Sequence, residues 1–213
     1  MQNRAKNQIM LVFIRHGKTQ ANSENRYLGR TDESISNSGV KELLSYKTQN
    51  YYSNVDYVFT SPMKRCIETA KIIYPKLSLT VIPEWKEIDF GRFEYKNYSE
   101  LKKDVQYQAW IDSQGTLDFP EGESRKHFIM RCERGFIKMC DILCHIAEQN
   151  TNTPIWLGII VHGGTIMALL SSFGGKNYFD CQPLNGRGYI CSMRWYETIS
   201  DKNNIKIEVV KKI

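Results

Sequence analysis

The chain has 213 residues, a formal net charge of +6 at pH 7 and 41% hydrophobic residues, an ordinary composition for a globular protein with one sizeable core. No apolar run approaches the roughly 18 residues that span a bilayer, and the amino-terminal segment has no signal-peptide core, so we expect a cytoplasmic protein without membrane contact. The basic residues lie largely in the tails and are not interleaved with aromatics. This favours a small phosphorylated ligand over nucleic acid, although a solvated surface explains most of the lysines.

The six cysteines show neither a Cys-x-x-Cys pair nor the spacing of a zinc site. They are interpreted as reduced core thiols rather than as disulfides or metal ligands. The cysteines are Cys66, Cys132, Cys140, Cys144, Cys181 and Cys191.

We expect one domain over residues 1–213.

The first predicted strand is the apolar run 11–14, which has no polar alternation and is therefore typical of a strand buried on both faces. Arg15, His16 and Gly17 follow it directly. Ligand-binding residues of an open α/β sheet occur at such strand ends, and a guanidinium beside an imidazole suits an anion site. The alternative is an ordinary strand end with a solvated arginine and histidine.

A polar loop over 17–36, a helix over about 37–49 and a strand over 55–60 come next. Ser61 and Pro62 then predict a helix start, with serine as the N-cap and proline at the first position. Arg65 would lie one turn into this helix, where the helix dipole also favours an anion. The alternative is a surface arginine paired with Glu68.

A short strand over 78–82 precedes a carboxylate-rich loop over 83–94. This loop offers Glu84, Glu87 and Glu94 as candidates for a general acid held against aromatic residues. The following polar and aromatic segment, about 92–125, has the character of a lid inserted into the α/β core. A helix is predicted within it over about 98–111, followed by a loop through Gly115.

Ser124 can cap a long helix that runs to about Glu148 and carries apolar residues at helical spacing from Phe128 to Ile146. That face is predicted to be core. His127 and His145 lie on the same helix and are interpreted as surface or structural histidines.

The run 154–161 is also typical of a strand buried on both faces. It is followed by His162 and Gly163, and a helix is predicted over 166–173. Two strand ends that both carry an imidazole and a glycine predict convergence on one site. Asn185-Gly186 marks a turn, and the segments 189–196 and 204–210 alternate as an antiparallel pair of strands.

Taken together and in order, these motifs resemble the histidine phosphatase superfamily, also called the phosphoglycerate mutase-like family. The resemblance runs from about residue 8 to residue 175. It implies a three-layer α/β/α sandwich with a mostly parallel central sheet and a helical lid. The motifs are Arg15-His16-Gly17-x-Thr19 with Asn22, Ser61-Pro62-x-x-Arg65 with Glu68-Thr69-Ala70, Glu87-Ile88-Asp89-Phe90-Gly91, Gly122-Glu123-Ser124 and His162-Gly163.

The resemblance also implies roles. His16 would be the nucleophile that forms a phosphohistidine, and Glu87, rather than its rivals Glu84 and Glu94, would be the general acid and base. Neither a metal ion nor a cofactor is expected. The phosphoryl oxygens would be bound by Arg15, Arg65 and His162, by the side chains of Thr19 and Asn22, and by backbone N–H groups near Leu28, Gly29 and Gly163.

The chain departs from the usual pattern of the family at a few positions, among them Lys18, which stands where Glu or Gln is usual and adds positive charge near the site mouth. Its compact length and Glu-Ile-Asp-Phe-Gly acid loop favour a phosphatase over a cofactor-dependent mutase. The pattern most resembles the α-ribazole phosphatase branch, which acts in cobalamin biosynthesis. Mutase-type phosphoryl transfer and a non-catalytic phospho-ligand binding module remain as alternatives, and the oligomeric state is open, with a homodimer as one option.

Overall fold

The computed structural model describes residues 6–147, 154–195 and 202–213. These residues contain a six-stranded sheet in the order β3-β2-β4-β1-β5-β6. The first four strands along the chain run parallel to one another, and β5 and β6 are antiparallel to their neighbours. The strands are β1 (Lys6–Arg15), β2 (Tyr57–Thr60), β3 (Leu79–Val81), β4 (Ile155–Val161), β5 (Gly188–Trp195) and β6 (Ile205–Lys212).

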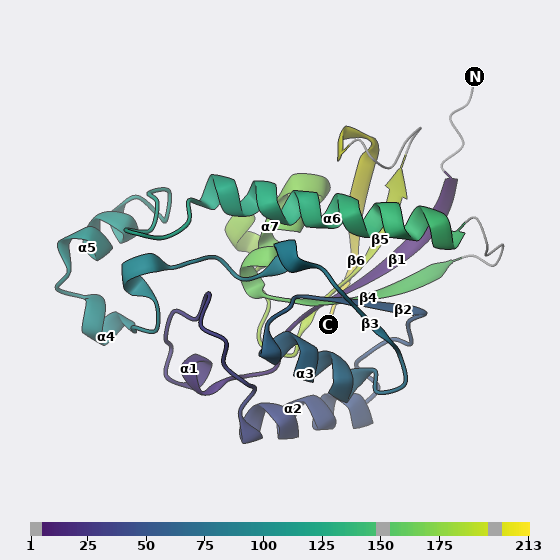
Figure 1. The fold of residues 1–213 in the computed structure, drawn as a ribbon, viewed down its shortest axis with the longest axis horizontal. Coiled ribbons are helices and arrows are strands. Elements are labelled where there is room, and N and C mark those ends of the chain that lie inside the picture. Colours follow the sequence, from purple (N-terminus) through teal and green to yellow (C-terminus); the bar gives the residue numbers. More distant parts are fainter. Residues whose placement is uncertain (1–5, 148–153, 196–201) are drawn as a thin grey trace.

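Helices cover both faces of this sheet, with α6 and α7 on one side and α2 and α3 on the other (Figure 1). The sandwich of three layers and its mostly parallel sheet confirm the predicted fold class. The helices are α1 (Gln20–Ser23), α2 (Asn37–Thr48), α3 (Lys64–Ile73), α4 (Tyr98–Leu101), α5 (Val105–Asp112), α6 (Arg125–Ala147) and α7 (Gly163–Gly174). Short 3-10 turns are η1 (Pro83–Trp85), η2 (Gly91–Phe93), η3 (Tyr178–Cys181) and η4 (Lys202–Asn204).

Strand β1 is buried on both faces, as its continuous apolar run predicts. Leu11 and Phe13 belong to the larger core under α6 and α7, whereas Val12 and Ile14 belong to the core under α2 and α3. Alternate side chains of one strand therefore anchor both helical layers. The strand is longer than predicted because its first residues also pair with β5.

Helix α3 begins later than predicted. Its N-cap is Met63, which supplies no side-chain hydrogen bond, and Pro62 lies in the bend before the helix instead of at its first position. Arg65 is consequently the second residue of the helix and not one turn inside it. Helix α7 begins earlier than predicted, directly after His162.

The helix predicted over 98–111 is two short helices, α4 and α5. Asp104 interrupts the helical run because its carboxylate accepts hydrogen bonds from the backbone N–H groups of Gln106 and Tyr107 and so starts a new helix. The segment that carries α4 and α5 extends beyond the end of the sheet (Figure 1), and its aromatic side chains pack on one another. This cluster contains Phe93, Tyr107, Trp110 and Phe119 of that segment, together with Tyr27 and Phe90 from two other loops.

Helix α6 buries the predicted apolar face from Phe128 to Leu143; the side chains of His145 and Ile146 lie outside the described residues. No disulfide joins the six cysteines, all of which the structure describes. Within the described ranges, no helix combines the length and the apolar character needed to cross a bilayer.

Candidate active site

The two histidines predicted at strand ends lie together. Strands β1 and β4 are parallel neighbours with Arg15 opposite Val161, so the residues after each strand emerge at the same edge of the sheet. The backbone N–H of His16 donates to the carbonyl of Val161 at 2.9 Å. The imidazole rings of His16 and His162 lie with their centroids 5.3 Å apart. The structure therefore brings the two predicted strand ends into one site.

His16 is held as a neutral imidazole with one nitrogen available. Its side chain is 3% exposed, and its Nδ1 lies 2.8 Å from the carbonyl oxygen of Gly17. A carbonyl can only accept, so Nδ1 carries the proton and Nε2 keeps its lone pair. Burial lowers the pKa of His16 well below its ordinary value, and the positive charges of Arg65 and Arg15 lower it further.

Two arginine guanidinium groups flank these histidines, and not all of their N–H donors have partners. Arg15 donates from one terminal nitrogen to the carbonyl of Pro183 at 3.0 Å. Arg65, which is fully buried, donates to the carbonyls of Thr31 and Gly29, each at 2.8 Å. The Nε atoms of both arginines are buried and have no hydrogen-bond partner among the described residues.

None of the ion pairs formed among the described residues includes Arg15 or Arg65. The alternative pairing of Arg65 with Glu68 is wrong, because the Glu68 carboxylate accepts from the backbone N–H of Ile35. Buried charges without a counterion are costly unless a ligand compensates them. This arrangement suits the binding of an anion.

Glu87 is the carboxylate that faces this site. One oxygen, Oε1, accepts from the N–H of Ile88 at 3.0 Å, and the other, Oε2, accepts from the N–H of Gly164 at 3.2 Å. Gly164 is the second residue of α7, where backbone donors have no partner within the helix. Burial raises the pKa of Glu87 despite the opposing effects of these N–H groups and of the two arginines. A raised pKa suits a group that must give up a proton near neutral pH.

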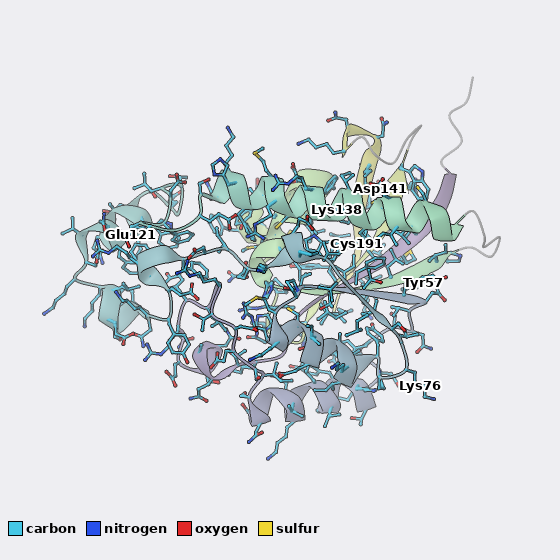
Figure 2. The ribbon with its side chains drawn as sticks, in the orientation of Figure 1. Tyr57, Lys76, Glu121, Lys138, Asp141 and Cys191 are labelled. Carbon is cyan, nitrogen blue, oxygen red and sulfur yellow. The ribbon has the colours of Figure 1, made fainter. Side chains whose placement is uncertain are left out.

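The two rival carboxylates are engaged elsewhere. Glu84 pairs with Lys138, which Figure 2 labels on α6. Glu94 accepts from the backbone N–H groups of Gly29 and Thr31, each at 3.0 Å, on the same loop whose carbonyls bind Arg65. Both carboxylates are thus used to hold loops.

His162 is fixed by the residue that was predicted to cap α3. The hydroxyl of Ser61 lies 2.8 Å from Nε2 of His162, and Ser61 also accepts from the N–H of Met63. The prediction of Ser61 as a helix N-cap is therefore wrong; its side chain supports the site. The sulfur of Cys66 lies 3.5 Å from the same nitrogen. Burial, followed by the charge of Arg65, lowers the pKa of His162 well below its ordinary value.

The residues predicted to bind phosphate differ in whether their polar groups already have partners within the protein. The hydroxyl of Thr19 is buried and caps α1 by accepting from the N–H of Asn22. Leu28 is buried, and the N–H of Gly29 is donated to Glu94, so Gly29 supports Arg65 through its carbonyl instead of offering its N–H to a ligand. Gly163 is the first residue of α7, and a methyl group on it would lie 3.6 Å from Nε of Arg15.

Sequence reasoning missed two residues of the site. Asn185 donates to the carbonyl of His16 at 3.1 Å and to the side-chain oxygen of Asn22 at 3.0 Å; the Asn-Gly pair had indicated a turn and nothing more. Arg131 of α6 binds both oxygens of Glu123 and the backbone carbonyl of Lys86 in the acid loop. No local pattern distinguishes that arginine from a surface residue of a helix.

A cavity of about 650 Å³ opens beside Glu87. Two of its basic residues are paired with acidic ones, Arg30 with Asp89 at 2.9 Å and Arg131 with Glu123 at 2.7 Å. The lining also contains Lys86 and His127. Glu87 belongs to the lining of this cavity, whereas His16 and His162 do not.

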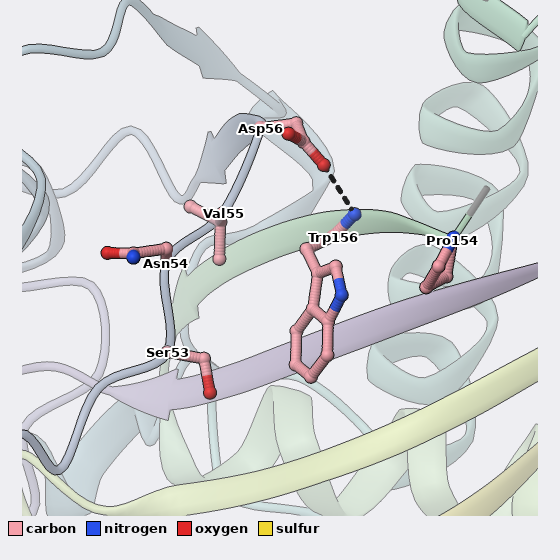
Figure 3. Close-up of a pocket in the computed structure, with 6 residues that line it drawn as sticks. All are labelled: Ser53, Asn54, Val55, Asp56, Pro154 and Trp156. Carbon is pink, nitrogen blue, oxygen red and sulfur yellow. Dashed lines mark hydrogen bonds between the residues drawn. The ribbon is translucent and has the colours of Figure 1, made fainter. Parts of the chain in front are cut away.

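A second hollow lies at the opposite end of the sheet, where β2 and β4 begin (Figure 3). There Asp56 accepts a hydrogen bond from the backbone N–H of Trp156 at 2.8 Å. It is separate from the histidines, which follow the strands. Among the described residues, no group of three His, Cys, Asp or Glu side chains is placed to hold a metal ion.

Comparisons with known proteins find relatives and solved structures that this chain resembles. The adenosylcobalamin/alpha-ribazole phosphatase of Escherichia coli (strain K12) is 27% identical over 137 residues, which are 62% of this chain and 68% of the relative. The crystal structure of the alpha-ribazole phosphatase from Shigella flexneri matches with a TM-score of 0.67 and 21% identity over 95% of each chain. The phosphoserine phosphatase from Entamoeba histolytica, solved in complex with 3-phosphoglyceric acid, matches with a TM-score of 0.70 and 20% identity over 96% of each chain.

A family model identifies the group to which the chain belongs. The model of the histidine phosphatase superfamily (branch 1) matches residues 11–207, nearly the whole chain. This span includes both histidine-bearing strand ends, both buried arginines and the acid loop. The chain therefore belongs to the histidine phosphatase superfamily, branch 1.

Proposed function

We propose that this protein is a phosphatase that hydrolyses a small phosphomonoester through a phosphohistidine intermediate on His16. The observation that carries the proposal is the pair of buried arginines, whose Nε atoms lack partners, beside a neutral imidazole whose Nε2 is unprotonated. A phosphate monoester is a dianion near neutral pH, and it would supply the missing counter-charge. Arginine suits this task because its planar donors match phosphate oxygens.

The first chemical step would transfer the phosphoryl group to His16. The Nε2 lone pair attacks phosphorus, an N–P bond forms, and the bond between phosphorus and the ester oxygen breaks. Glu87 gives its proton to the departing alkoxide, which its raised pKa favours. Arg15, Arg65 and His162 would stabilise the negative charge on the transferring group, together with the N–H groups at the start of α7.

The second step would return the enzyme to its starting state. The carboxylate of Glu87 takes a proton from water, the water oxygen attacks phosphorus, and the N–P bond breaks to release inorganic phosphate. In this scheme the two arginines stay charged throughout, and one carboxyl group serves both proton transfers. The chain's own cations provide the stabilisation that a metal ion provides in many other phosphoryl-transfer enzymes.

The substrate we propose first is α-ribazole phosphate, because relatives of this chain carry that activity in their names. A second candidate is phosphoserine, for which one structural neighbour is named. The cavity beside Glu87 supports phosphoserine as a candidate. Lys86 and His127 line this cavity and could bind the carboxylate of the substrate, whereas Arg30 and Arg131 are already paired with acidic residues. Mutase-type transfer and ligand binding without turnover remain the alternatives.

The test is phosphate release from a panel of phosphomonoesters in the presence of EDTA, with His16→Ala as the control. The panel contains α-ribazole phosphate, phosphoserine, 3-phosphoglycerate and sugar phosphates. Release that survives EDTA and is lost in the variant supports the phosphohistidine mechanism, and the highest kcat/KM identifies the substrate class. Absence of release from every ester would refute the phosphatase proposal, and isomerisation of 3-phosphoglycerate would favour a mutase.

A further inference from the structure

The turn after η3 reaches back to the candidate nucleophile. We propose that Asn185 is a positioning residue that orients the carboxamide of Asn22 and the main chain of His16 for phosphate binding. The proposal rests on the proposed function, in which His16 attacks the phosphoryl group, and on the expectation from the sequence that the side chain of Asn22 binds a phosphoryl oxygen. Its basis is two hydrogen bonds from a single group: Nδ2 of Asn185 donates to Oδ1 of Asn22 at 3.0 Å and to the carbonyl of His16 at 3.1 Å.

These contacts determine which end of the Asn22 carboxamide is free. Its Oδ1 accepts from Asn185 and also from the backbone N–H of Thr19 at 3.3 Å. An amide oxygen accepts and an amide nitrogen donates, so two donors on one side fix the oxygen there and turn the NH₂ group away from them. No acceptor within the described ranges bonds that NH₂ group. It is therefore left as a donor for a ligand oxygen.

The same turn holds the end of β1 at further points. The N–H of Gly186 donates to the carbonyls of Arg15 and His16, at 3.0 and 3.2 Å. The N–H of Arg15 donates to the carbonyl of Arg187 at 2.9 Å, and its guanidinium donates to the carbonyl of Pro183. The turn and the strand end are thus one hydrogen-bonded unit, and Asn185 is the member that extends this unit to Asn22.

An aromatic clamp fixes the turn from the outside. The guanidinium carbon of Arg187 lies 4.4 Å from the ring centroids of both Tyr46 and Tyr51, and the hydroxyl of Tyr52 donates to the carbonyl of Gly186 at 2.9 Å. Cation–π contacts and a half-buried hydrogen bond limit the movement of the turn. The turn that carries Asn185 is consequently fixed by the end of β1 on one side and by the aromatic clamp on the other. A side chain on a fixed turn can in turn orient the side chain of Asn22.

The decisive variant is Asn185→Asp, which keeps the shape but replaces the donor by an acceptor. An aspartate would face the carbonyl of His16 and Oδ1 of Asn22, both acceptors, so the Asn22 amide would turn its NH₂ group toward Asp and away from the ligand. We expect kcat/KM to fall about 10- to 100-fold in Asn185→Asp and Asn185→Ala, as for the loss of a buried polar partner. Asn177, on the same segment, donates to Asp180; Asn177→Ala is the matched control and should leave activity unchanged.

A double-mutant cycle separates positioning from a general loss of stability. If Asn185 acts through Asn22, Asn22→Ala and Asn185→Ala together should cost little more than Asn22→Ala alone, apart from the share that Asn185 exerts on His16. A merely structural role predicts independent effects whose fold-changes multiply. Multiplicative losses in the cycle, or unaltered kcat/KM in Asn185→Asp, would overturn the inference.

Binding of inorganic phosphate, measured by calorimetry, provides a readout that needs no turnover. We expect the Kd for phosphate to rise about tenfold in Asn185→Asp while thermal unfolding confirms a folded protein. If the wild type binds phosphate but hydrolyses no ester, the proposed function fails and the phosphate affinities still decide the role of Asn185. If the wild type hydrolyses esters and the variant retains its phosphate affinity, the inference fails and the function stands.

Discussion

The carboxylate of Glu87 fits against the first turn of α7 because residue 164 has no side chain. The N–H of Gly164 donates to Oε2 of Glu87 at 3.2 Å, and a methyl group on Gly164 would overlap Oε1 and lie 3.2 Å from the ring of Phe128. The glycine therefore gives the acid both its hydrogen-bond donor and its space. Helix α7 thus begins at one candidate site residue, His162, and positions another, Glu87.

Gly164→Ala should displace Glu87 and lose general-acid catalysis. We expect kcat to fall about 100-fold on alkyl phosphates, which need protonation of the leaving oxygen. The loss should be much smaller on p-nitrophenyl phosphate, whose leaving group is stable as an anion. Steady-state kinetics on the two esters checks this, and an equal loss on both would show that the substitution damages more than the acid.

Glu87→Gln should change the pH dependence of the reaction. The rate requires neutral His16 and protonated Glu87, so it should fall at low pH through the lowered pKa of His16 and fall at higher pH through the raised pKa of Glu87. A glutamine cannot titrate, so the descending limb that belongs to Glu87 should disappear from the profile of kcat/KM for an alkyl phosphate, measured at the lower rate that the variant retains. The same limb in both enzymes would assign it to another group, such as the ester itself.

The same substitution should stabilise the free protein at neutral pH. The pKa of Glu87 is raised in the folded state, so the native carboxyl binds its proton more tightly than the unfolded one. The favourable contribution of this group is complete below about pH 4.3 and is lost as pH rises through the folded pKa. Glu87→Gln should therefore raise Tm at pH 7, and the gain should shrink toward pH 4. A lower Tm at pH 7 would mean that the charged carboxylate stabilises the two arginines more than burial penalises it.

The parts of this protein that were predicted from sequence are those with a local pattern. The buried runs ending in His16 and His162 show in composition alone, and their convergence follows from the geometry of parallel strands. Asp104, which caps α5, is a residue type that favours helix N-caps, yet the prediction placed one continuous helix across it. Exact helix boundaries are the part of the fold that local sequence patterns define least well.

The contacts missed by sequence reasoning join residues far apart in the chain. Ser61 has the composition of a helix cap, yet its hydroxyl bonds His162, 101 positions away. Asn185 similarly bonds the carbonyl of His16 across the end of the sheet. Such pairings depend on which strand ends become neighbours, and no spacing within either segment reveals them.

Glu94 and Arg65 hold opposite sides of one loop, and removing Glu94 should weaken phosphate binding at a distance. Glu94 accepts the N–H groups of Gly29 and Thr31, and Arg65 donates to their carbonyls. Glu94→Ala leaves two backbone donors without an acceptor, so we expect a Tm lower by several degrees and a Kd for phosphate raised about tenfold. Calorimetry and thermal unfolding measure both, with Asp118→Asn, an exposed carboxylate of the same segment, as the control. Wild-type phosphate affinity in Glu94→Ala would show that Arg65 is held without the loop.

The two buried histidines should make the free protein sensitive to acid. Both have a folded pKa well below the ordinary value, so below about pH 6.5 the unfolded chain binds protons that the native state does not, and stability falls as pH falls. His16→Asn and His162→Asn each remove one such group, so the drop in Tm between pH 7.5 and 5.5 should be smaller in each variant than in the wild type. Replacing His127, which is exposed, by Asn is the matched control and should leave the drop unchanged. An equal drop in all four proteins would show that His16 and His162 become protonated without cost in the folded state, which would also remove the reason for expecting a neutral nucleophile.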